Sequence, residues 1–189
     1  MTTLGSLTWE PALDHPDLLA VPTLAAVRAW AERDERVARE VVVTEIDPGL
    51  ADTAALTEAF ALPPAASANC VLVSGRREGV EKVAACVVRA TTRADVNNAV
   101  KRLLDVRKAS FLPTDRAVAD SGMEYGGITP IGLPDGYRVL VDAAVAVPHP
   151  DAGALVVIGS GVRRSKVALP GALLGSAPGV EVVDGLALG

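Results

Sequence analysis

The chain has 189 residues, half of them hydrophobic, so it can bury a sizeable core but is short for two full domains. Its formal net charge of −5 excludes the uniformly basic surface of a protein that coats nucleic acid. Two residues each of Trp, Tyr and Phe are too few for an extended base-stacking platform. We therefore expect one domain over residues 1–189, which would contact nucleic acid, if at all, through its backbone and shape.

Neither a membrane segment nor a metal site is expected. No apolar run reaches the roughly 18–20 residues that cross a bilayer, and residues 1–13 lack the pattern of a secretory signal. Cys70 and Cys86 each lie in an apolar run, as reduced core thiols do. With His15 and His149 as the only histidines, a zinc site would need ligands from unrelated segments. The sequence predicts a cytoplasmic protein with no metal and no membrane partner.

Residues 1–62 are predicted to form an N-terminal helix-strand-helix elaboration. Apolar side chains recur at helical spacing over 17–33, where Pro22 falls near the first turn, and residues 41–46 indicate a strand. Asp52 can cap a helix that runs to about Phe60. Residues 1–60 carry eleven acids against four arginines. A structural or interaction protein that docks a partner through this acidic part is one of the functions left open.

Residues 63–176 are predicted to form a strand-rich core. Strands at 70–73 and 83–88 flank a polar stretch as in an antiparallel hairpin. Further elements are a helix at 95–104, a strand at 108–111, a helix at 115–121 and strands at 139–142, 155–158 and 166–169. Regular βαβ units are too few for a doubly wound fold. The fold class is therefore α/β of the mixed, α+β kind, with a barrel-like mixed sheet.

Basic residues gather in three clusters in this core. They are Arg76-Arg77, Lys101-Arg102 with Arg107-Lys108, and Arg163-Arg164 with Lys166. Such clusters on an acidic protein suit local contact with a phosphate backbone. The alternative for each cluster is a solvated face.

The loop Gly126-Gly127-Ile128-Thr129-Pro130 is the leading candidate for a functional site. Its glycines permit positive φ and close approach of a ligand, while proline fixes the backbone direction. Adjacent amides can hold a carboxylate, a phosphate or a developing oxyanion. The alternative is a rigid turn between a helix and a strand.

A second loop of small residues, Gly159-Ser160-Gly161, follows a predicted strand and precedes Arg163. This order places an arginine where it could grip a phosphate. The spacing is neither that of a Walker A loop nor that of a dinucleotide fingerprint, so no nucleotide cofactor is expected.

These segments together resemble a known family. The stretch from about Ala65 to Leu174 resembles the YbaK and EbsC group of prolyl-tRNA-synthetase-associated editing domains. The resemblance is carried by Asn69-Cys70-Val71-Leu72-Val73, Arg107-Lys108-Ala109-Ser110-Phe111, Gly126 to Pro130 with Gly132, and Gly159 to Arg163. The glycine and proline loop, which matches the family's G-x-x-x-P element, is the most specific of them.

The resemblance implies an aminoacyl-tRNA deacylase that hydrolyses mischarged tRNA in trans. Synthetase pockets reject a closely related side chain by only ~1 to 3 kcal/mol, so a second, hydrolytic site restores accuracy. The partners would be the acceptor end of an aminoacyl-tRNA and, as a second candidate, a synthetase. The catalytic site would comprise Asn69 with Gly126, Gly127, Ile128, Thr129 and Pro130, whose amides orient the ester carbonyl. Substrate binding would fall to Lys108, Ser110, Gly159, Ser160, Gly161 and Arg163.

One position departs from the family pattern. Members commonly carry a lysine where this chain has Asn69, and asparagine supplies no charge. Either Lys108 or Arg163 provides the cation, or the chain is a non-catalytic binding domain for the aminoacyl-tRNA end. Strand alternation places Cys70 on the face opposite Asn69, which predicts a core thiol and not a nucleophile.

Overall fold

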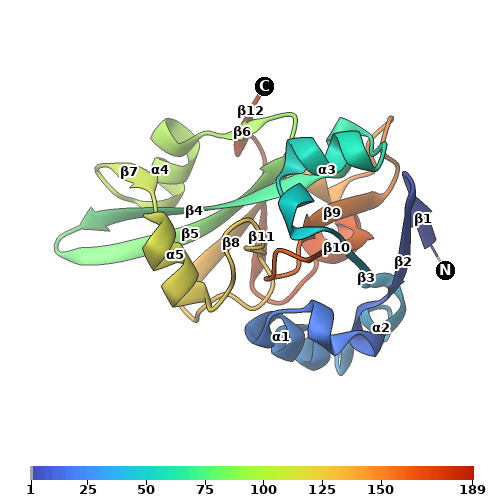
Figure 1. Cartoon of the computed structure of the whole chain (residues 1–189). Coiled ribbons are helices and arrows are strands. Elements are labelled where there is room, and N and C mark those ends of the chain that lie inside the picture. Colours follow the sequence, from blue (N-terminus) through green and yellow to red (C-terminus); the bar gives the residue numbers. More distant parts are fainter. Residues whose placement is uncertain (1) are drawn as a thin grey trace.

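Two five-stranded sheets form the framework of the protein in the computed structural model, which describes residues 2–189 (Figure 1). The first sheet is antiparallel and has the order β1-β2-β3-β10-β9. Its strands are β1 (Thr2–Leu4), β2 (Leu7–Pro11), β3 (Val42–Glu45), β9 (Leu155–Gly159) and β10 (Ser165–Pro170). Because β3 pairs with β10, the N-terminal residues are built into the same sheet as strands from the end of the chain.

The second sheet is mixed and has the order β11-β8-β5-β4-β7. Its strands are β4 (Ala68–Arg77), β5 (Val80–Arg89), β7 (Ala109–Phe111), β8 (Tyr137–Asp142) and β11 (Val180–Val183). β4 and β5 form the expected hairpin, whose two-residue turn places Glu78 and Gly79 at φ of 53° and 83°. Positive φ at both positions matches the right-handed twist of the strands. β8 lies parallel to both β5 and β11.

The two sheets meet along β4 and β9. Ser67 and Val157 form a single parallel bridge there, so the sheets curl toward each other as a half-barrel. The largest apolar cluster fills the space between them, with Val87 and Val141 from one sheet and Val167 and Leu169 from the other. Each fully buried side chain of this size stabilises the fold by ~1.5 to 3 kcal/mol. The expected mixed α/β, barrel-like architecture is confirmed.

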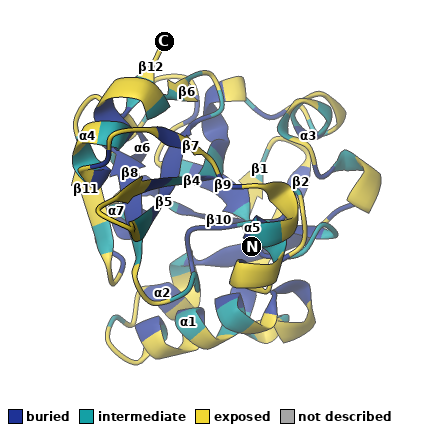
Figure 2. Ribbon diagram, turned by 90° about the vertical axis from the view of Figure 1, so that its left-hand side faces the viewer, coloured by how far each residue is buried: buried dark blue, intermediate teal, exposed yellow. Residues whose placement is uncertain are grey.

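Helices cover the outside of the sheets, and their outward faces are exposed in Figure 2. Val27 and Trp30 of α1 pack into the main core. The α-helices are α1 (Val21–Ala31), α2 (Val37–Glu40), α3 (Thr53–Ala59), α4 (Lys101–Leu104), α5 (Thr114–Ser121), α6 (Ala143–Ala146) and α7 (Gly171–Gly175). Short helical turns are η1 (Ala12–Asp14), η2 (Pro16–Leu18), η3 (Pro48–Leu50), η4 (Pro64–Ala66) and the π-helical η5 (Val96–Val100).

The elements expected from the sequence are confirmed, with small shifts at their ends. Pro22 is the second residue of α1, where its missing N–H costs nothing, so the helix begins at Val21, just before the proline. The helix expected at 95–104 starts as the π-helical turn η5, capped by Asp95, before it becomes α4. Strands β1, β2, β11 and the pair β6 (Arg93–Ala94) and β12 (Ala187–Leu188) were not expected. No helix within residues 2–189 is both long and apolar enough to cross a bilayer.

Candidate functional site

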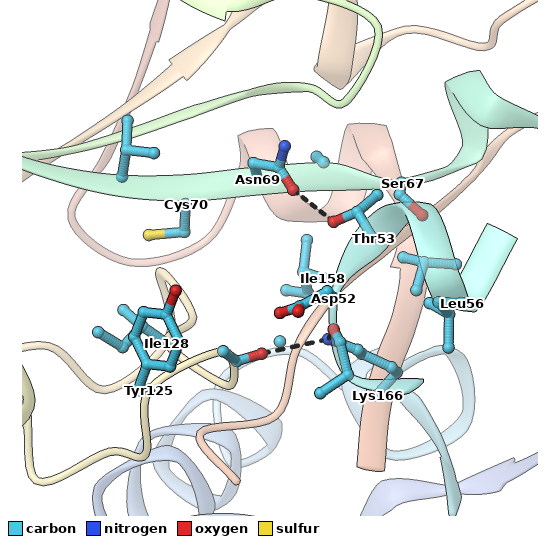
Figure 3. Close-up of a pocket in the computed structure, with 16 residues that line it drawn as sticks. Asp52, Thr53, Leu56, Ser67, Asn69, Cys70, Tyr125, Ile128, Ile158 and Lys166 are labelled. Carbon is cyan, nitrogen blue, oxygen red and sulfur yellow. Dashed lines mark hydrogen bonds between the residues drawn. The ribbon is translucent and has the colours of Figure 1, made fainter. Parts of the chain in front are cut away.

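A cavity of about 270 Å³ lies where β4 and β9 separate beyond their bridge. One wall is β4 from Ala68 to Val71, and the opposite wall is the end of β9. The start of α3 and the loop at Gly126 close the remaining sides (Figure 3). Because the two sheets diverge at this point, neither strand completes its hydrogen-bond ladder across the gap, which leaves room for a ligand.

The cavity has an apolar part and a polar part. Leu56, Val157, Ile158 and Ile128 supply the apolar walls. The polar groups are Asp52, Thr53, Ser67, Asn69 and Lys166. The Ser67 hydroxyl is buried and has no hydrogen-bond partner within the described chain, residues 2–189. An apolar pocket with a few convergent polar groups is the usual form of a small-ligand site.

Lys166 is the buried cation of this cavity. Strand alternation explains its position, because Val167 and Leu169 of β10 point into the main core while Lys166 and Ala168 face the other way. Its Nζ donates hydrogen bonds to the carbonyl oxygens of Ala51 at 2.6 Å and Gly126 at 3.3 Å. Since an ammonium has three N–H groups, one remains for a ligand.

Burial lowers the pKa of Lys166 to about 8, with a smaller contribution from the Arg163 guanidinium, while the Asp52 carboxylate acts in the opposite direction. The lysine is only 6% exposed, so its charge meets little water. At neutral pH the ammonium form still predominates. The site therefore holds a positive charge that is weakly solvated, and such a charge interacts strongly with a negative group beside it.

Asp52 places a negative charge at the same cavity. It is the N-cap residue of α3 and is exposed, so its carboxylate stands at the mouth and is accessible to a ligand. In Figure 3 it lies between Lys166 and the Asn69–Thr53 pair. The cavity thus offers an acceptor for a cationic group and a donor for an anionic one within a small space.

Asn69 lines the cavity from β4, as expected, but its amide is already engaged on one side. The Thr53 hydroxyl donates to Asn69 Oδ1 at 2.8 Å, which ties β4 to the start of α3. This contact orients the Asn69 side chain so that its NH₂ group is the part left for a ligand. Asn69 and Lys166 line the same cavity from opposite sheets.

The loop 126–130 is only partly turned toward the cavity. Gly126 and Ile128 line it, whereas Gly127, Thr129 and Pro130 do not. The Gly127 amide donates to the Glu124 carbonyl at 2.9 Å, and the Thr129 amide contacts the Met123 sulfur at 3.5 Å. The amides of Gly126 and Ile128 make no hydrogen bond within the part of the chain that is described.

Gly127 serves packing. A Cβ there would come within 2.7 Å of the Val162 backbone, so the residue lets two loops lie against each other. The Gly127 carbonyl also accepts a hydrogen bond from the Gly161 amide at 2.7 Å.

The second loop supports the first and contributes one lining residue. Gly159 lines the cavity, and a Cβ there would collide with the carbonyls of Gly127 and Ile128. Ser160 is fully buried, and its hydroxyl lies 2.7 Å from that of Ser165. Gly161 lies outside the cavity with φ of 90°. The structure therefore places Ser160 and Gly161 in the scaffold behind the site.

Arg163 also acts within the chain. It donates to the carbonyl oxygens of Tyr125 and Pro48, each at 3.1 Å, and its guanidinium lies 5.9 Å from the centre of the Tyr125 ring. These contacts fasten η3 to the loop that carries Gly126. Lys108 and Ser110 are exposed at β7, and neither lines the cavity. Neither Arg163 nor Lys108 therefore supplies the cation that was expected in the cavity.

Cys70 departs from its expected position. It lines the cavity together with Asn69, since the cavity wraps around the β4 edge, and is only partly buried. Desolvation, with a smaller effect of the nearby Cys86, raises the pKa of its thiol far above the usual range. The pKa of Cys86 is raised to about 12 by burial. Because the thiolate is the nucleophilic form, both thiols are inert at neutral pH, as expected for Cys70.

The sequence reasoning missed Lys166, Asp52, Thr53 and Ser67 as lining residues. A signal for Lys166 was present, because it is a lysine at the start of an otherwise apolar strand. It was grouped with Arg163 and Arg164 as a surface cluster, which its burial contradicts. In residues 2–189 no group of three or more His, Cys, Asp or Glu side chains is placed to hold a metal ion.

Comparisons with known proteins identify the family and the fold. Residues 47–175 match the family model of the aminoacyl-tRNA editing domain. The hypothetical protein APE2540 has a similar crystal structure, with a TM-score of 0.71, 16% identity, and coverage of 86% of this chain and 99% of that one. A proposed trans-editing enzyme for prolyl-tRNA synthetase gives a TM-score of 0.67, 17% identity, and coverage of 90% and 99%. At such identities the structures show a shared fold. A search of curated proteins finds no match.

Proposed function

The chain belongs to the aminoacyl-tRNA editing domain family, and from this premise we propose that it hydrolyses the ester of a mischarged aminoacyl-tRNA. The cavity between β4 and β9 would be the aminoacyl pocket. Its volume of about 270 Å³ is below the ~300 to 1,000 Å³ of typical ligand sites, which favours a small amino acid. The neighbour's description makes tRNA charged by prolyl-tRNA synthetase the first substrate to examine.

The observation that carries the proposal is Lys166. Family members commonly place a lysine where this chain has Asn69, and the cavity still contains an ammonium group, supplied by the opposite sheet. A deacylase needs positive charge or N–H donors near the carbonyl oxygen, because that oxygen becomes negative in the transition state. Lys166 has an N–H available and little competing water around it.

Three of the polar groups then have a role. The Asp52 carboxylate pairs with the α-ammonium of the amino acid, and Leu56, Val157 and Ile158 surround its side chain. Lys166 donates to the ester carbonyl oxygen. A water molecule attacks the carbonyl carbon, the bond from that carbon to the ribose oxygen breaks, and the ribose oxygen leaves with a proton that the attacking water gives up. Asn69 donates from its NH₂ group to the reacting end. The products are a free amino acid and an uncharged tRNA.

A binding domain without hydrolysis is the alternative. It rests on Asn69, since an asparagine in place of the lysine lowers the charge at the β4 wall. The two functions predict the same bound complex and differ only in turnover. Activity therefore separates them.

Deacylation should be measured on a panel of tRNAs charged with small amino acids, using wild type and Lys166→Met. We expect wild type to hydrolyse at least one member. Lys166→Met should lower its rate by about 10² to 10³, the usual loss for one donor to the developing oxyanion. Lys82→Met, which changes a half-exposed lysine on the far part of β5, is the matched control and should retain the wild-type rate.

Circular dichroism must show that Lys166→Met is folded, because the variant leaves the Ala51 and Gly126 carbonyls without a donor. If wild type binds charged tRNA but hydrolyses none of the panel, the binding-domain alternative is correct. If hydrolysis persists unchanged in folded Lys166→Met, the assignment of Lys166 is wrong.

A further inference from the structure

A second, larger cavity adjoins the first. Its volume is about 510 Å³, and it lies between β4, β6, β7 and η5. Asn69 and Val71 line both cavities, so the two form neighbouring parts of one depression on either side of the β4 edge. A ligand that ends in the first cavity can continue into the second past these two residues.

The walls of this groove combine exposed apolar side chains with hydrogen-bonding groups. Phe111 of β7 is 62% exposed and Leu188 of β12 is 40% exposed, although both are large apolar side chains. Asn97, exposed on η5, offers an amide beside them. The groove also contains Asp95, but its carboxylate accepts hydrogen bonds from the Asn98 and Ala99 amides and caps η5. An exposed aromatic face is suited to stacking on a nucleobase.

Positive charge without ion-pair partners lies in the groove wall at Arg93 and on the segment that follows η5 in the chain. Arg93 lines it, and α4 and the following loop, which continue from η5, bring further cations. Within residues 2–189 none of these side chains forms an ion pair: Arg93, Lys101, Arg102, Arg107 and Lys108. On a chain with a net charge of −5, such a face selects for a polyanion.

We propose that this groove binds the single-stranded 3′ end of the RNA whose terminal ribose carries the ester. The base of the terminal nucleoside stacks on Phe111, its ribose lies beside Asn69 and Val71, and the preceding phosphates follow Arg93 and the cations of α4. This proposal rests on the proposed function and deepens it, because it gives the substrate's nucleotide part a site distinct from the aminoacyl pocket. It also assigns Lys108 to RNA contact outside the cavity.

The test uses binding of an uncharged CCA trinucleotide, the 3′ end that tRNAs share, to the full chain by fluorescence anisotropy. Phe111→Ala should weaken binding about 5- to 100-fold, the loss that removal of one base–aromatic stack causes. Val182→Ala, another exposed apolar residue at 47% exposure on β11, is the matched control and should bind like wild type. AMP should bind more weakly than CCA, since it lacks the preceding phosphates.

A second variant tests the charges. Arg93→Ala should reduce the slope of log affinity against log salt by about 0.7, the value for one phosphate contact on a single strand. Arg33→Ala, which removes an exposed arginine without an ion pair from the N-terminal part, should leave the slope unchanged.

No binding of CCA by wild type would overturn the proposal, as would equal affinity of wild type and Phe111→Ala. Equal affinity for AMP and CCA would show that the groove binds a free nucleotide and not the RNA end, and would also overturn the proposal. The outcome is separable from hydrolysis, because CCA carries no ester. If CCA binds through Phe111 but no charged tRNA is hydrolysed, the groove is an RNA-binding site and the deacylase proposal is wrong.

Discussion

Two basic segments that look alike in the sequence have opposite roles in the structure. In the first, Arg163 to Lys166, every cation is engaged inside the molecule: Arg163 binds two carbonyls, Arg164 pairs with Asp17 and Glu45, and Lys166 is buried in the cavity. In the second, Lys101 to Lys108, the cations form no ion pair within residues 2–189 and follow directly on η5, which lines a groove. The difference teaches that a cluster of basic residues indicates a nucleic-acid surface only where the fold leaves it without partners.

The largest expected effect concerns Lys166 and pH. If its ammonium form is needed, kcat/KM should be constant below pH 8 and should fall about tenfold per unit above it, because deprotonation removes the donor. The sign follows from the lowered pKa, since an exposed lysine would stay charged to above pH 10. Initial rates on the best substrate, corrected for the uncatalysed hydrolysis that rises with pH, provide the measurement. A rate that stays flat to pH 10 would show that Lys166 does not act as a cation.

The second segment should control the salt dependence of tRNA binding. Replacing Lys101, Arg102, Arg107 and Lys108 together with alanine should reduce the slope of log affinity against log salt by up to about 3, if each cation meets one phosphate. Filter binding of uncharged tRNA at several salt concentrations measures this slope. An unchanged slope would show that these residues are only a solvated face, and the comparison between the two segments would then fail.

The smallest expected effect concerns Arg163, and it is on stability. Arg163→Ala removes the hydrogen bonds to Tyr125 and Pro48 and should lower Tm by about 2 to 4 °C, which is the shift for roughly 1 kcal/mol in a chain of this size. The salt slope for tRNA should not change, because the guanidinium faces carbonyl groups of its own chain. A lower slope with an unchanged Tm would show that Arg163 contacts RNA and does not stabilise the fold.

Most of the fold was predictable because the local pattern and the tertiary environment agree. The ten-residue strands of the hairpin contain apolar runs, and a two-residue turn joins them. Helix α5 is followed by Gly122, whose φ of 64° ends the helix. The strands β1 and β11 were missed because few of their apolar side chains are buried. Val182 of β11 is 47% exposed, so the strand has no buried apolar face that a sequence pattern could reveal. It exists because its backbone pairs with β8.

The candidate site was predictable in part. Asn69, Gly126, Ile128 and Gly159 line the cavity, while the other residues assigned to it pack behind it or lie elsewhere. A glycine required for close packing and a glycine required for ligand approach look the same in a sequence. Gly127 and Gly126 are neighbours, yet a side chain on Gly127 would meet the Val162 backbone, and Gly126 presents its carbonyl to Lys166.

The sequence by itself determined seven of the strands, the position of the glycine loops and the family to which residues 47–175 belong. Local spacing and turn chemistry suffice for these, because each depends on residues close together in the chain. Only the tertiary structure decided which cation enters the cavity. Lys166 lies 97 positions after Asn69 in the sequence, and the two meet because β10 and β4 belong to sheets whose edges come together at Ser67 and Val157. The charge of Lys166 interacts strongly with a ligand because the surrounding fold keeps water away from it, and that burial depends on residues distant in the sequence.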